Sequence, residues 1–562
     1  MLSRARLRLL VALCAILLSA SPAAWAQSQL RIIPPQDNQA VAAVLERGQK
    51  FEQQRKWADA LTLYEEAAKR FPDNAVLDQH FNSAKMHYDL GRRYNDASFR
   101  NCIATLSETQ ALDLYSEVLL KVQTHYVANP DWQTMIVRGT RCLDLAVVEP
   151  AFVERQLKNV AAEKIDGFRQ ELATLINARP VRTRQDARDM VTAVERLAAL
   201  RLAIPGPATV MEYISGATGS LDEYSSYLTP DQLTDVYSQI EGNFVGLGIE
   251  LKAADQALLI VRVIPNSPAE RSGIKAGDRI TAVDGHSVQE TNTDQAAEML
   301  QGREGTVVEV VVVTGKDEPR RLRVRREHVD VPSVDDVKIL DAQQGIGYLK
   351  LVCFQKTTSK DMDAALWKLN RDGMRSLIMD LRGNPGGLLT ASVDVADKFI
   401  DDGIIVSTRG RSPQEDFNYS ARKGGSWQVP LVVLIDGDSA SASEIFAGAV
   451  RDHHRATLVG VRSYGKGSVQ GIFPLSLAGA GLRLTTAKFY SPNGLPFAKV
   501  GVEPDILVRS AAKPLFDPNP AEPPVAPALI ASGETGLTAI GPPEDATLAA
   551  GLQAARKQLA QR

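Results

Sequence analysis

A strand–helix–strand pattern between residues 431 and 460 constrains the fold more than any other feature of this sequence. The apolar run from Leu431 to Ile435 predicts a buried strand, and a shorter run from Thr457 to Val459 predicts a second. Between them, one helical face is formed by Ile445, Phe446, Ala449 and Val450. Two strands joined by a helix form a βαβ unit, so we expect a sheet layered against helices here.

Three serines lie at the junction between the first predicted strand and the helix, in the run Ser439-Ala-Ser441-Ala-Ser443-Glu444. Backbone N–H groups at a helix N-terminus have no partner within the helix and face whatever precedes it. A nucleophilic serine placed there would have an oxyanion donor beside it, the N–H of the following residue. Ser441 and Glu444 also have the spacing of a capping box, so a serine that only caps the helix is an alternative.

Lys466 lies between two glycines, Gly465 and Gly467, shortly after the second strand. An isolated lysine is ordinarily a solvated surface cation. Flanking glycines, however, allow tight backbone conformations and the close approach of other groups. A lysine kept from water loses its proton more readily and can then act as general base to a serine. Such a Ser–Lys pair requires no histidine.

The stretch as a whole resembles the catalytic core of the carboxy-terminal processing proteases, the tail-specific Ser–Lys peptidases. Their motif runs SASASE and then, after a helix and a strand, FGKGxxQ. The resemblance implies that Ser441 is the nucleophile, Lys466 the general base and Gln470 the residue that positions the lysine. Tyr464 stands where phenylalanine is usual in the family, a departure that we expect to leave the chemistry unchanged.

Two other interpretations of this stretch fit the residues less well. Residues 460–466 begin like a P-loop, but Gly467 occupies the position of the magnesium-binding serine or threonine, and a strand pattern follows instead of a helix. A Ser-His-Asp triad would need Asp452, His453 or His454, which are consecutive at a helix end and can hardly supply both base and orienter. The serines also lack the G-x-S-x-G pattern of a nucleophile elbow.

Length and composition define the broad class. A chain of 562 residues is expected to form several domains, and a net charge of −3 lacks the basic excess of nucleic-acid-binding proteins. The seven histidines are scattered and form no HExxH motif, which argues against a metalloprotease. A Ser–Lys mechanism requires neither a metal nor an organic cofactor, so we expect none.

The first 26 residues have the pattern of a signal peptide. Arg4, Arg6 and Arg8 precede an apolar core from Leu9 to Leu18, and residues 24–26 form an Ala-x-Ala cleavage signature. A retained N-terminal anchor is the alternative, but the apolar run is short for a membrane span. We therefore expect an exported protein, in the periplasm or cell envelope of a bacterium, with no integral membrane span after cleavage.

Export also bears on the cysteines that remain after cleavage, because exported proteins can form disulfides. Cys102 and Cys142 fall in the same predicted helical region and are the favoured pair, although the sequence does not establish it. Cys353 ends a strand-like run and is predicted to be a small buried hydrophobe.

Residues 39–100 are predicted to be helical, with small and aromatic residues at the spacings of a tetratricopeptide (TPR) repeat. The positions concerned are Gly48, Phe51, Ala60, Tyr64, Ala67 and Pro72. A weaker echo relates residues 57–60 to residues 94–97, and a plain helical hairpin is the alternative because a solenoid needs several stacked repeats. TPR-like helices would offer a surface to a protein partner. Residues 101–205 continue as helices without a pattern that suggests chemistry.

Residues 235–328 resemble a PDZ domain, and residues 206–234 resemble the part of the protease core that precedes it. The latter include Leu221-Asp-Glu-Tyr-Ser-Ser-Tyr-Leu228, where Glu223 and Tyr224 depart from the family form LDPHSSYL. In a PDZ domain, backbone N–H groups of a glycine-containing loop bind a peptide's carboxylate, and the peptide adds as a strand. The resemblance places this loop at Val245, Gly246, Leu247, Gly248 and Ile249. Taken alone, the glycine pair would fit a hairpin or a bulge.

A glycine-rich loop from Arg382 to Gly387 follows a predicted strand and resembles the family's DLRxNPGG loop. The resemblance implies that the N–H groups of Gly387 and Ala442 form the oxyanion hole, with the adjacent glycine left open as the donor instead of Gly387. The protease core is predicted to span residues 329–510. Residues 511–562 are expected to be a flexible tail rich in proline and alanine that ends in a short amphipathic helix.

Together these patterns predict a multidomain α+β protein: a TPR-like helical region, then a PDZ domain inserted in an α/β serine-protease core. The resemblance implies an exported serine endopeptidase that captures protein substrates by exposed apolar C-terminal ends. The alternatives are a non-catalytic PDZ/TPR scaffold or chaperone in the cell envelope, or an enzyme gated through its PDZ domain. Intact Ser441, Lys466 and Gln470 argue against a catalytically dead scaffold.

Overall fold

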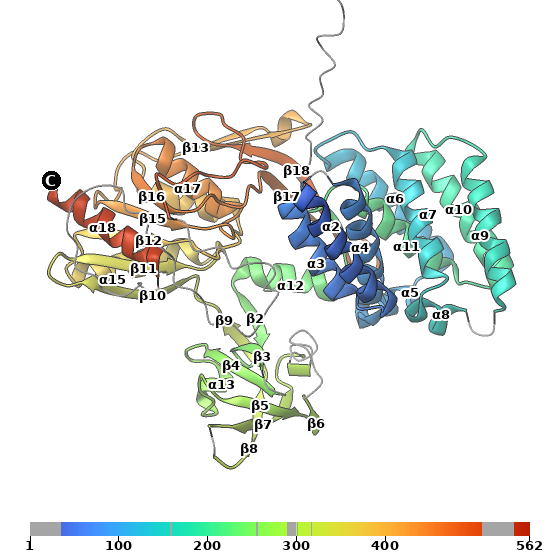
Figure 1. The fold of residues 1–562 in the computed structure, drawn as a ribbon, viewed down its shortest axis with the longest axis horizontal. Coiled ribbons are helices and arrows are strands. Elements are labelled where there is room, and N and C mark those ends of the chain that lie inside the picture. Colours follow the sequence, from blue (N-terminus) through green and yellow to red (C-terminus); the bar gives the residue numbers. More distant parts are fainter. Residues whose placement is uncertain are drawn as a thin grey trace, which may run out of the picture. The chain divides into compact units, whose positions relative to one another are not determined.

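The computed structural model (Figure 1) describes residues 35–72, 74–157, 160–254, 257–288, 299–300, 302–315, 317–508 and 545–561. It contains helices and sheets and divides into two compact units, one of Met1–Arg100 and Leu145–Lys158, the other of Asn101–Asp144 and Asn159–Arg562. The predicted signal peptide lies outside the described residues. Within the described ranges, none of the helices has both the length and the apolar character needed to cross a membrane.

Paired helices form the first unit. They are α2 (Pro35–Gln53), α3 (Trp57–Arg70), α4 (Ala75–Asn95), the start of α5 (Ala97–Thr105) and α8 (Pro150–Gln156). Gly48 of α2 faces the ring of Tyr64 in α3, which a β-carbon at that position would strike. Ala60 is fully buried, and Trp57 stacks on His87 with the ring centroids 3.9 Å apart. The predicted small-residue positions therefore lie at helix–helix contacts.

A helix layer opens the second unit. It is formed by α6 (Glu108–His125), α7 (Trp132–Ala146), α9 (Ala162–Asn177), α10 (Arg184–Leu202) and α11 (Gly206–Gly219). α11 is buried along most of its length, and a β-carbon on its Gly216 would strike the backbone of Gly139 in α7. Glycines at this crossing thus allow the two helices to approach closely.

The cysteines differ from their predicted state. Cys102 and Cys142 are buried thiols, so the favoured disulfide is not formed. The Sγ of Cys102 lies 3.9 Å from the hydroxyl oxygen of Tyr227. Cys353 follows a strand, is only partly buried, and places its Sγ 3.2 Å from the Oε1 of Gln355. Cys353 therefore makes a polar contact at the end of a strand and does not belong to the apolar core.

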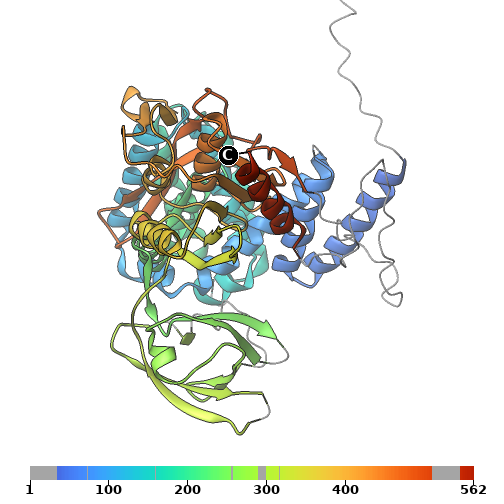
Figure 2. The same cartoon turned by 90° about the vertical axis from the view of Figure 1, so that its left-hand side faces the viewer.

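The described residues between 243 and 330 form a separate β-structure (green strands in Figure 2). α12 (Pro230–Glu241) leads into it, and β2 (Asn243–Gly246) pairs antiparallel with β9 (Glu327–Asp330), so the chain enters and leaves side by side. The main sheet has the order β3-β4-β5-β7-β8, with β6 beside β5. Its elements are β3 (Ile249–Ala254), β4 (Ala257–Val263), α13 (Pro268–Arg271), β5 (Arg279–Val283), β6 (His286–Ser287), β7 (Val307–Val313) and β8 (Arg320–Arg325). β3 therefore lies at one edge of this sheet.

A six-stranded sheet in the order β10-β11-β12-β15-β16-β19 is the centre of the second unit. β10 (Val334–Asp341) is antiparallel to β11 (Ile346–Leu351). The parallel strands that follow are β12 (Ser376–Asp380), β15 (Leu431–Ile435), β16 (Ala456–Gly460) and β19 (Ile506–Leu507). Because β12 and β15 are adjacent and parallel, the loops that follow them leave the same edge of the sheet.

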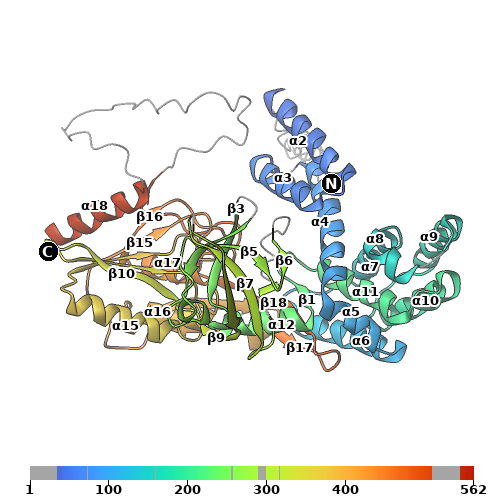
Figure 3. The same ribbon diagram turned by 90° about the horizontal axis from the view of Figure 1, so that it is seen from below.

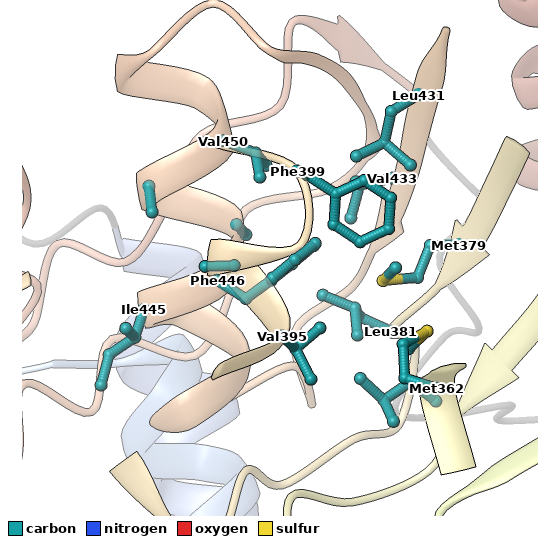
Figure 4. Packing of buried hydrophobic residues seen from close by; sticks show 14 of the residues in the cluster. Met362, Met379, Leu381, Val395, Phe399, Leu431, Val433, Ile445, Phe446 and Val450 are labelled. Atoms are coloured by element: carbon teal, nitrogen blue, oxygen red, sulfur yellow. The ribbon is translucent and has the colours of Figure 1, made fainter. Parts of the chain in front are cut away.

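Helices cover both faces of this sheet. α15 (Thr358–Arg371), α16 (Leu389–Asp397) and α17 (Ala442–Asp452) pack on one face, through buried residues such as Met379 and Phe446 (Figure 4). α18 (Ala546–Ala560) lies on the other face, as Figure 3 shows. There it shares a buried apolar cluster with Ile378 and Leu434 of the sheet. The C-terminal helix thus belongs to the folded core, whereas the sequence predicted a flexible tail with a short helix at its end.

A second sheet carries the segment that follows Lys466. Its order is β1-β18-β13-β14, and β17 also pairs with β18. The elements are β1 (Ser226–Leu228), β13 (Ile404–Gly410), the short 3-10 helix Pro413–Glu415, β14 (Phe417–Ser420), β17 (Ser468–Pro474) and β18 (Gly481–Tyr490). β18 therefore joins β1, which precedes the separate β-structure, to β17, which begins just after Lys466.

Candidate active site

Hydrogen bonds join two loops at one edge of the central sheet. The Ser439 hydroxyl donates to the carbonyl of Leu381 (2.8 Å), and the Ser443 hydroxyl donates to the carbonyl of Asn384 (3.0 Å). The N–H of Ala440 donates to the same Asn384 carbonyl (3.0 Å). Ser439 and Ser443 are both buried. Two of the three serines therefore hold the glycine-rich loop against the segment that contains Ser439 to Ser443.

Ser441, the middle serine, differs from its neighbours. It is partly exposed, and it is the N-cap residue of α17. An ordinary N-cap residue has extended backbone, but Ser441 has φ 57° and ψ −114°, a combination that L-residues rarely adopt. Such a conformation costs about 1–3 kcal/mol and persists only where the surrounding structure enforces it. The capping interpretation is correct for the position of Ser441 but does not account for its strain.

The buried carboxylate of Glu444 binds both the serine and the lysine segments. Its Oε2 accepts hydrogen bonds from the N–H of Ser441 (2.8 Å) and the N–H of Lys466 (2.9 Å). Its Oε1 accepts from the hydroxyl of Ser463 (2.7 Å) and the N–H of Gly465 (2.6 Å). Burial raises the pKa of Glu444, while these hydrogen bonds act in the opposite direction by favouring the charged carboxylate. One side chain thus fixes the start of α17 relative to the lysine.

Sequence reasoning missed this role and treated Glu444 only as the last residue of a capping box. The capping spacing did contain part of the signal, because the N–H of Ser441 is the group that such a glutamate accepts. The bond to Lys466 could not be found in the same way, since it depends on how α17 and the segment after β16 pack.

Lys466 is partly buried. Burial lowers its pKa, Arg483 lowers it further, and the carboxylates of Glu444 and Glu223 act in the opposite direction. The Nζ of Lys466 lies 4.9 Å from the centroid of the Tyr224 ring. The lysine therefore has the burial that a general base requires, in surroundings that include groups of both signs.

The glycines beside Lys466 have the close contacts that the sequence predicted. Gly465 has φ 93°, and its carbonyl accepts a hydrogen bond from the N–H of Lys499 (2.8 Å). A β-carbon on Gly467 would strike the backbone of Ala498. Both glycines are therefore needed for the segment around residue 498 to pass against the lysine.

The side chain of Gln470 makes its hydrogen bonds to Ser468. Its Nε2 donates to the hydroxyl (2.9 Å) and the carbonyl (3.2 Å) of Ser468, and among the described residues it has no hydrogen bond to Lys466. Both residues belong to one short segment, so a different rotamer of Gln470 is required for the predicted contact. The role that the resemblance gives to Gln470 stays a prediction.

The glycine pair of the loop lies against Ser441. A β-carbon on Gly386 would be 2.8 Å from the Cβ of Ser441 and 2.9 Å from the nitrogen of Ala442. The N–H of Gly386 already donates to the Oδ1 of Asn384 (2.9 Å). Within the described part of the chain, the N–H groups of Gly387 and Ala442 have no acceptor. Of the two glycines that the sequence left open, Gly387 is the one with an available donor.

Comparison with known proteins identifies the family. Residues 345–508 match peptidase family S41, and residues 259–314 match the PDZ domain family. The chain is 38% identical over 322 residues to the carboxy-terminal-processing protease of Bartonella bacilliformis, which covers 56% of this chain and 73% of that protein. The chain belongs to the carboxy-terminal processing proteases of family S41.

Two further carboxy-terminal processing proteases resemble the chain. It is 34% identical over 296 residues to the carboxyl-terminal-processing protease of Synechocystis sp., covering 52% of this chain and 69% of that protein. The solved structure of the photosystem II D1 C-terminal processing protease is 26% identical, with a TM-score of 0.38, and covers 71% of this chain and 93% of that one.

In the PDZ domain of this carboxy-terminal processing protease, the residues predicted to bind a carboxylate lie between β2 and an edge strand, β3. Val245 and Gly246 end β2, Leu247 and Gly248 form the connection, and Ile249 begins β3. Leu247 is buried, and its carbonyl accepts from the N–H of Ala269 (2.9 Å). Gly248 has φ 81°, which favours glycine. In the described residues β3 pairs only with β4, so its outer edge can receive an added strand.

Arg382, the first residue of the glycine-rich loop, connects the protease's C-terminal helix to that loop. Its guanidinium binds the buried carboxylate of Asp380 and, through Nη1 and Nη2, the carboxylate of Asp545 at 2.7 and 2.8 Å. Asp545 is the N-cap residue of α18. Asp380 also accepts a hydrogen bond from the hydroxyl of Tyr348 (2.9 Å). α18 is thus tied to the loop that contains Gly387.

Proposed function

We propose that this carboxy-terminal processing protease is an exported serine endopeptidase with Ser441 as nucleophile and Lys466 as general base. The observation that carries the proposal is the buried carboxylate of Glu444, which binds the backbone N–H groups of both residues. Burial also lowers the pKa of Lys466, which favours the neutral form that a base needs. The other serines, Ser439 and Ser443, use their hydroxyls to hold a loop.

In the proposed mechanism, neutral Lys466 takes the proton of the Ser441 hydroxyl as Oγ attacks the carbonyl carbon of a substrate peptide bond. The N–H groups of Gly387 and Ala442 donate to the oxyanion, each contributing on the order of 3 kcal/mol. The protonated lysine then gives its proton to the leaving amine, and a water molecule activated by the lysine hydrolyses the acyl-enzyme. Gln470 positions the lysine once its amide turns away from Ser468.

In this proposal, substrates are proteins with exposed apolar C-terminal ends. The N–H groups of residues 245–249 bind the terminal carboxylate, and the peptide adds to the outer edge of β3. The edge position of β3 and the positive φ of Gly248 support this assignment. Capture by the PDZ domain brings a substrate chain to Ser441 and raises its local concentration there.

Location and partner are two further parts of the proposal. The signal-peptide pattern of residues 1–26 supports export to the periplasm or cell envelope, and the relatives described above are bacterial. We assign the helices α2 to α4 to binding of a protein partner, on the basis of their TPR-like spacing and packing. A non-catalytic scaffold is the second candidate, favoured only if the chain binds C-terminal peptides without cleaving them.

The test is cleavage of an unfolded protein with an apolar C-terminus, such as casein or a tagged reporter, across pH. We expect Ser441→Ala and Lys466→Ala to lose cleavage, and Lys488→Ala, which changes an exposed lysine of β18, to retain it. The lysine is inactive while protonated, so wild-type activity should rise as pH passes its pKa, which lies below the ordinary lysine value. Cleavage that survives in Ser441→Ala would contradict the proposal.

A further inference from the structure

Tyr224 is held against Lys466 by a fixed turn. The Oδ1 of Asp222 accepts hydrogen bonds from the N–H groups of Tyr224 (2.9 Å) and Ser225 (2.8 Å). The hydroxyl of Ser225 accepts from the N–H of Thr485 in β18 (3.2 Å). The ring of Tyr224 therefore meets the lysine from a turn that is bonded to itself and to the neighbouring sheet.

The same turn is continuous with β1, which pairs with β18 opposite Arg483. An Nη2 of Arg483 donates to the hydroxyl of Ser226 (3.2 Å), and its Nε has no hydrogen-bond partner among the described residues. Arg483 is partly buried and acts on Lys466 as a second positive charge. A second cation nearby favours the neutral form of Lys466, so a group that favours its charged form acts against Arg483.

Two groups of the turn favour the charged lysine. The face of an aromatic ring attracts a cation within about 6 Å of its centroid, and the Nζ of Lys466 lies 4.9 Å from that of Tyr224. The carboxylate of Glu223, the preceding residue, acts in the same direction and is exposed to solvent. Glu444 of α17 adds a third contribution, while Tyr464 contacts Tyr224. Arg483 of β18 therefore disfavours the charged lysine, while Tyr224, Glu223 and Glu444 favour it.

We propose that Tyr224 and Glu223 are positioning residues that favour the protonated form of Lys466 over the neutral one and so set the pH at which the lysine becomes a base. The proposal rests on the Ser441–Lys466 mechanism proposed above. These are the two positions at which this segment departs from the family form LDPHSSYL.

The matched variants are Tyr224→Leu, which removes the ring face but keeps an apolar side chain, and Tyr224→Phe, which keeps the face. We expect Tyr224→Leu to move the acidic limb of the cleavage profile to lower pH by about half to one unit. Tyr224→Phe should stay close to wild type. Glu223→Gln should produce a smaller shift in the same direction that disappears at high salt, because this carboxylate is exposed. Tyr237→Leu, at an exposed tyrosine of α12, is the control.

A second measurement does not depend on cleavage. In the Ser441→Ala background, the rate at which an amine-reactive reagent labels Lys466 is followed across pH by mass spectrometry. Only a neutral amine reacts, so the midpoint of labelling reports the pKa of Lys466. We expect this midpoint to fall in Tyr224→Leu and in Glu223→Gln, by the amounts expected for cleavage.

Each outcome separates the two proposals. A labelling midpoint that is unchanged or higher in Tyr224→Leu overturns the role of Tyr224, whether or not the protein cleaves its substrate. Cleavage that persists in Ser441→Ala overturns the proposed mechanism instead, and the labelling midpoints still decide the contact. If Tyr224→Leu does not fold, Glu223→Gln decides the question at an exposed position.

Discussion

At the scale of the residue, Glu444 carries the largest testable effect. Glu444→Gln replaces a carboxylate oxygen by an amide NH₂ group. This NH₂ group would face backbone N–H groups whose hydrogen bonds Glu444 now accepts, so two donors would point at each other. We expect kcat to fall by about one to two orders of magnitude with little change in KM, and unfolding to become easier by about 1–3 kcal/mol. Reporter-peptide kinetics and urea denaturation measure the two effects.

Glu503→Gln provides the control for this variant, because Glu503 is an exposed carboxylate in a long contact with Arg462. It should leave both quantities close to wild type. A Glu444→Gln enzyme with the kcat of the wild type would show that the shared carboxylate does not position the dyad.

Residue-level expectations from the sequence are most specific where chemistry demands particular residue types in a particular order. The positions of Ser441, Lys466 and Gly387 followed from the motif, and the structure brings the segments of all three together. The contact of Tyr224 with Lys466 could not be predicted, because it arises only when β1 and β17 both pair with β18. The rotamer of Gln470 could not be predicted either, because its side-chain amide binds Ser468 instead of Lys466.

At the scale of the element, the ion pair between α18 and Arg382 makes a prediction with a defined pH dependence. The hydrogen bond from Arg382 lowers the pKa of Asp545 in the folded chain. The stability it provides is therefore present above the ordinary aspartate pKa of about 4 and is lost as pH falls below it. Asp545→Asn should unfold about 0.5 kcal/mol more easily at pH 7, given the partial exposure of the pair.

Asp545→Ala is the comparison, because asparagine can still cap α18 at the N–H of Leu548 and alanine cannot. Loss of the cap should add about 1 kcal/mol to the effect. We also expect a lower kcat in Asp545→Asn, since the loop with Gly387 is held less firmly. Urea midpoints at pH 7 and pH 3 test the assignment, and an equal loss of stability at both would contradict it.

The docking of α18 shows why one element was predicted incompletely. Its amphipathic pattern was visible, but the proline-rich segment before it favoured a loose tail. A mostly parallel sheet needs cover on both faces, and α15, α16 and α17 all pack on one of them. That requirement, rather than local composition, assigns the last helix to the core.

At the scale of the whole molecule, the PDZ domain can be removed at a defined place. The N–H of Val331 donates to the carbonyl of Gly242 (2.8 Å), so deletion of residues 243–330 leaves two ends that a short glycine linker can join. If the PDZ domain captures apolar C-terminal ends as proposed, the shortened enzyme should cleave substrates with apolar and charged C-termini equally well. The gating hypothesis adds that unfolded substrates which do not depend on capture should be cleaved faster. Cleavage that falls for every unfolded substrate and never rises would end the gating hypothesis.

The backbone of Ser441 also limits how this protein can change over evolutionary time. Glycine adopts a positive φ without strain, so at this position it would fold more easily than serine while removing the proposed nucleophile. Selection for cleavage is then what keeps serine there. A lineage that no longer needed cleavage would drift toward glycine at this site while keeping its PDZ domain. Glycine at the equivalent position of a relative would mark the descendant of a protease.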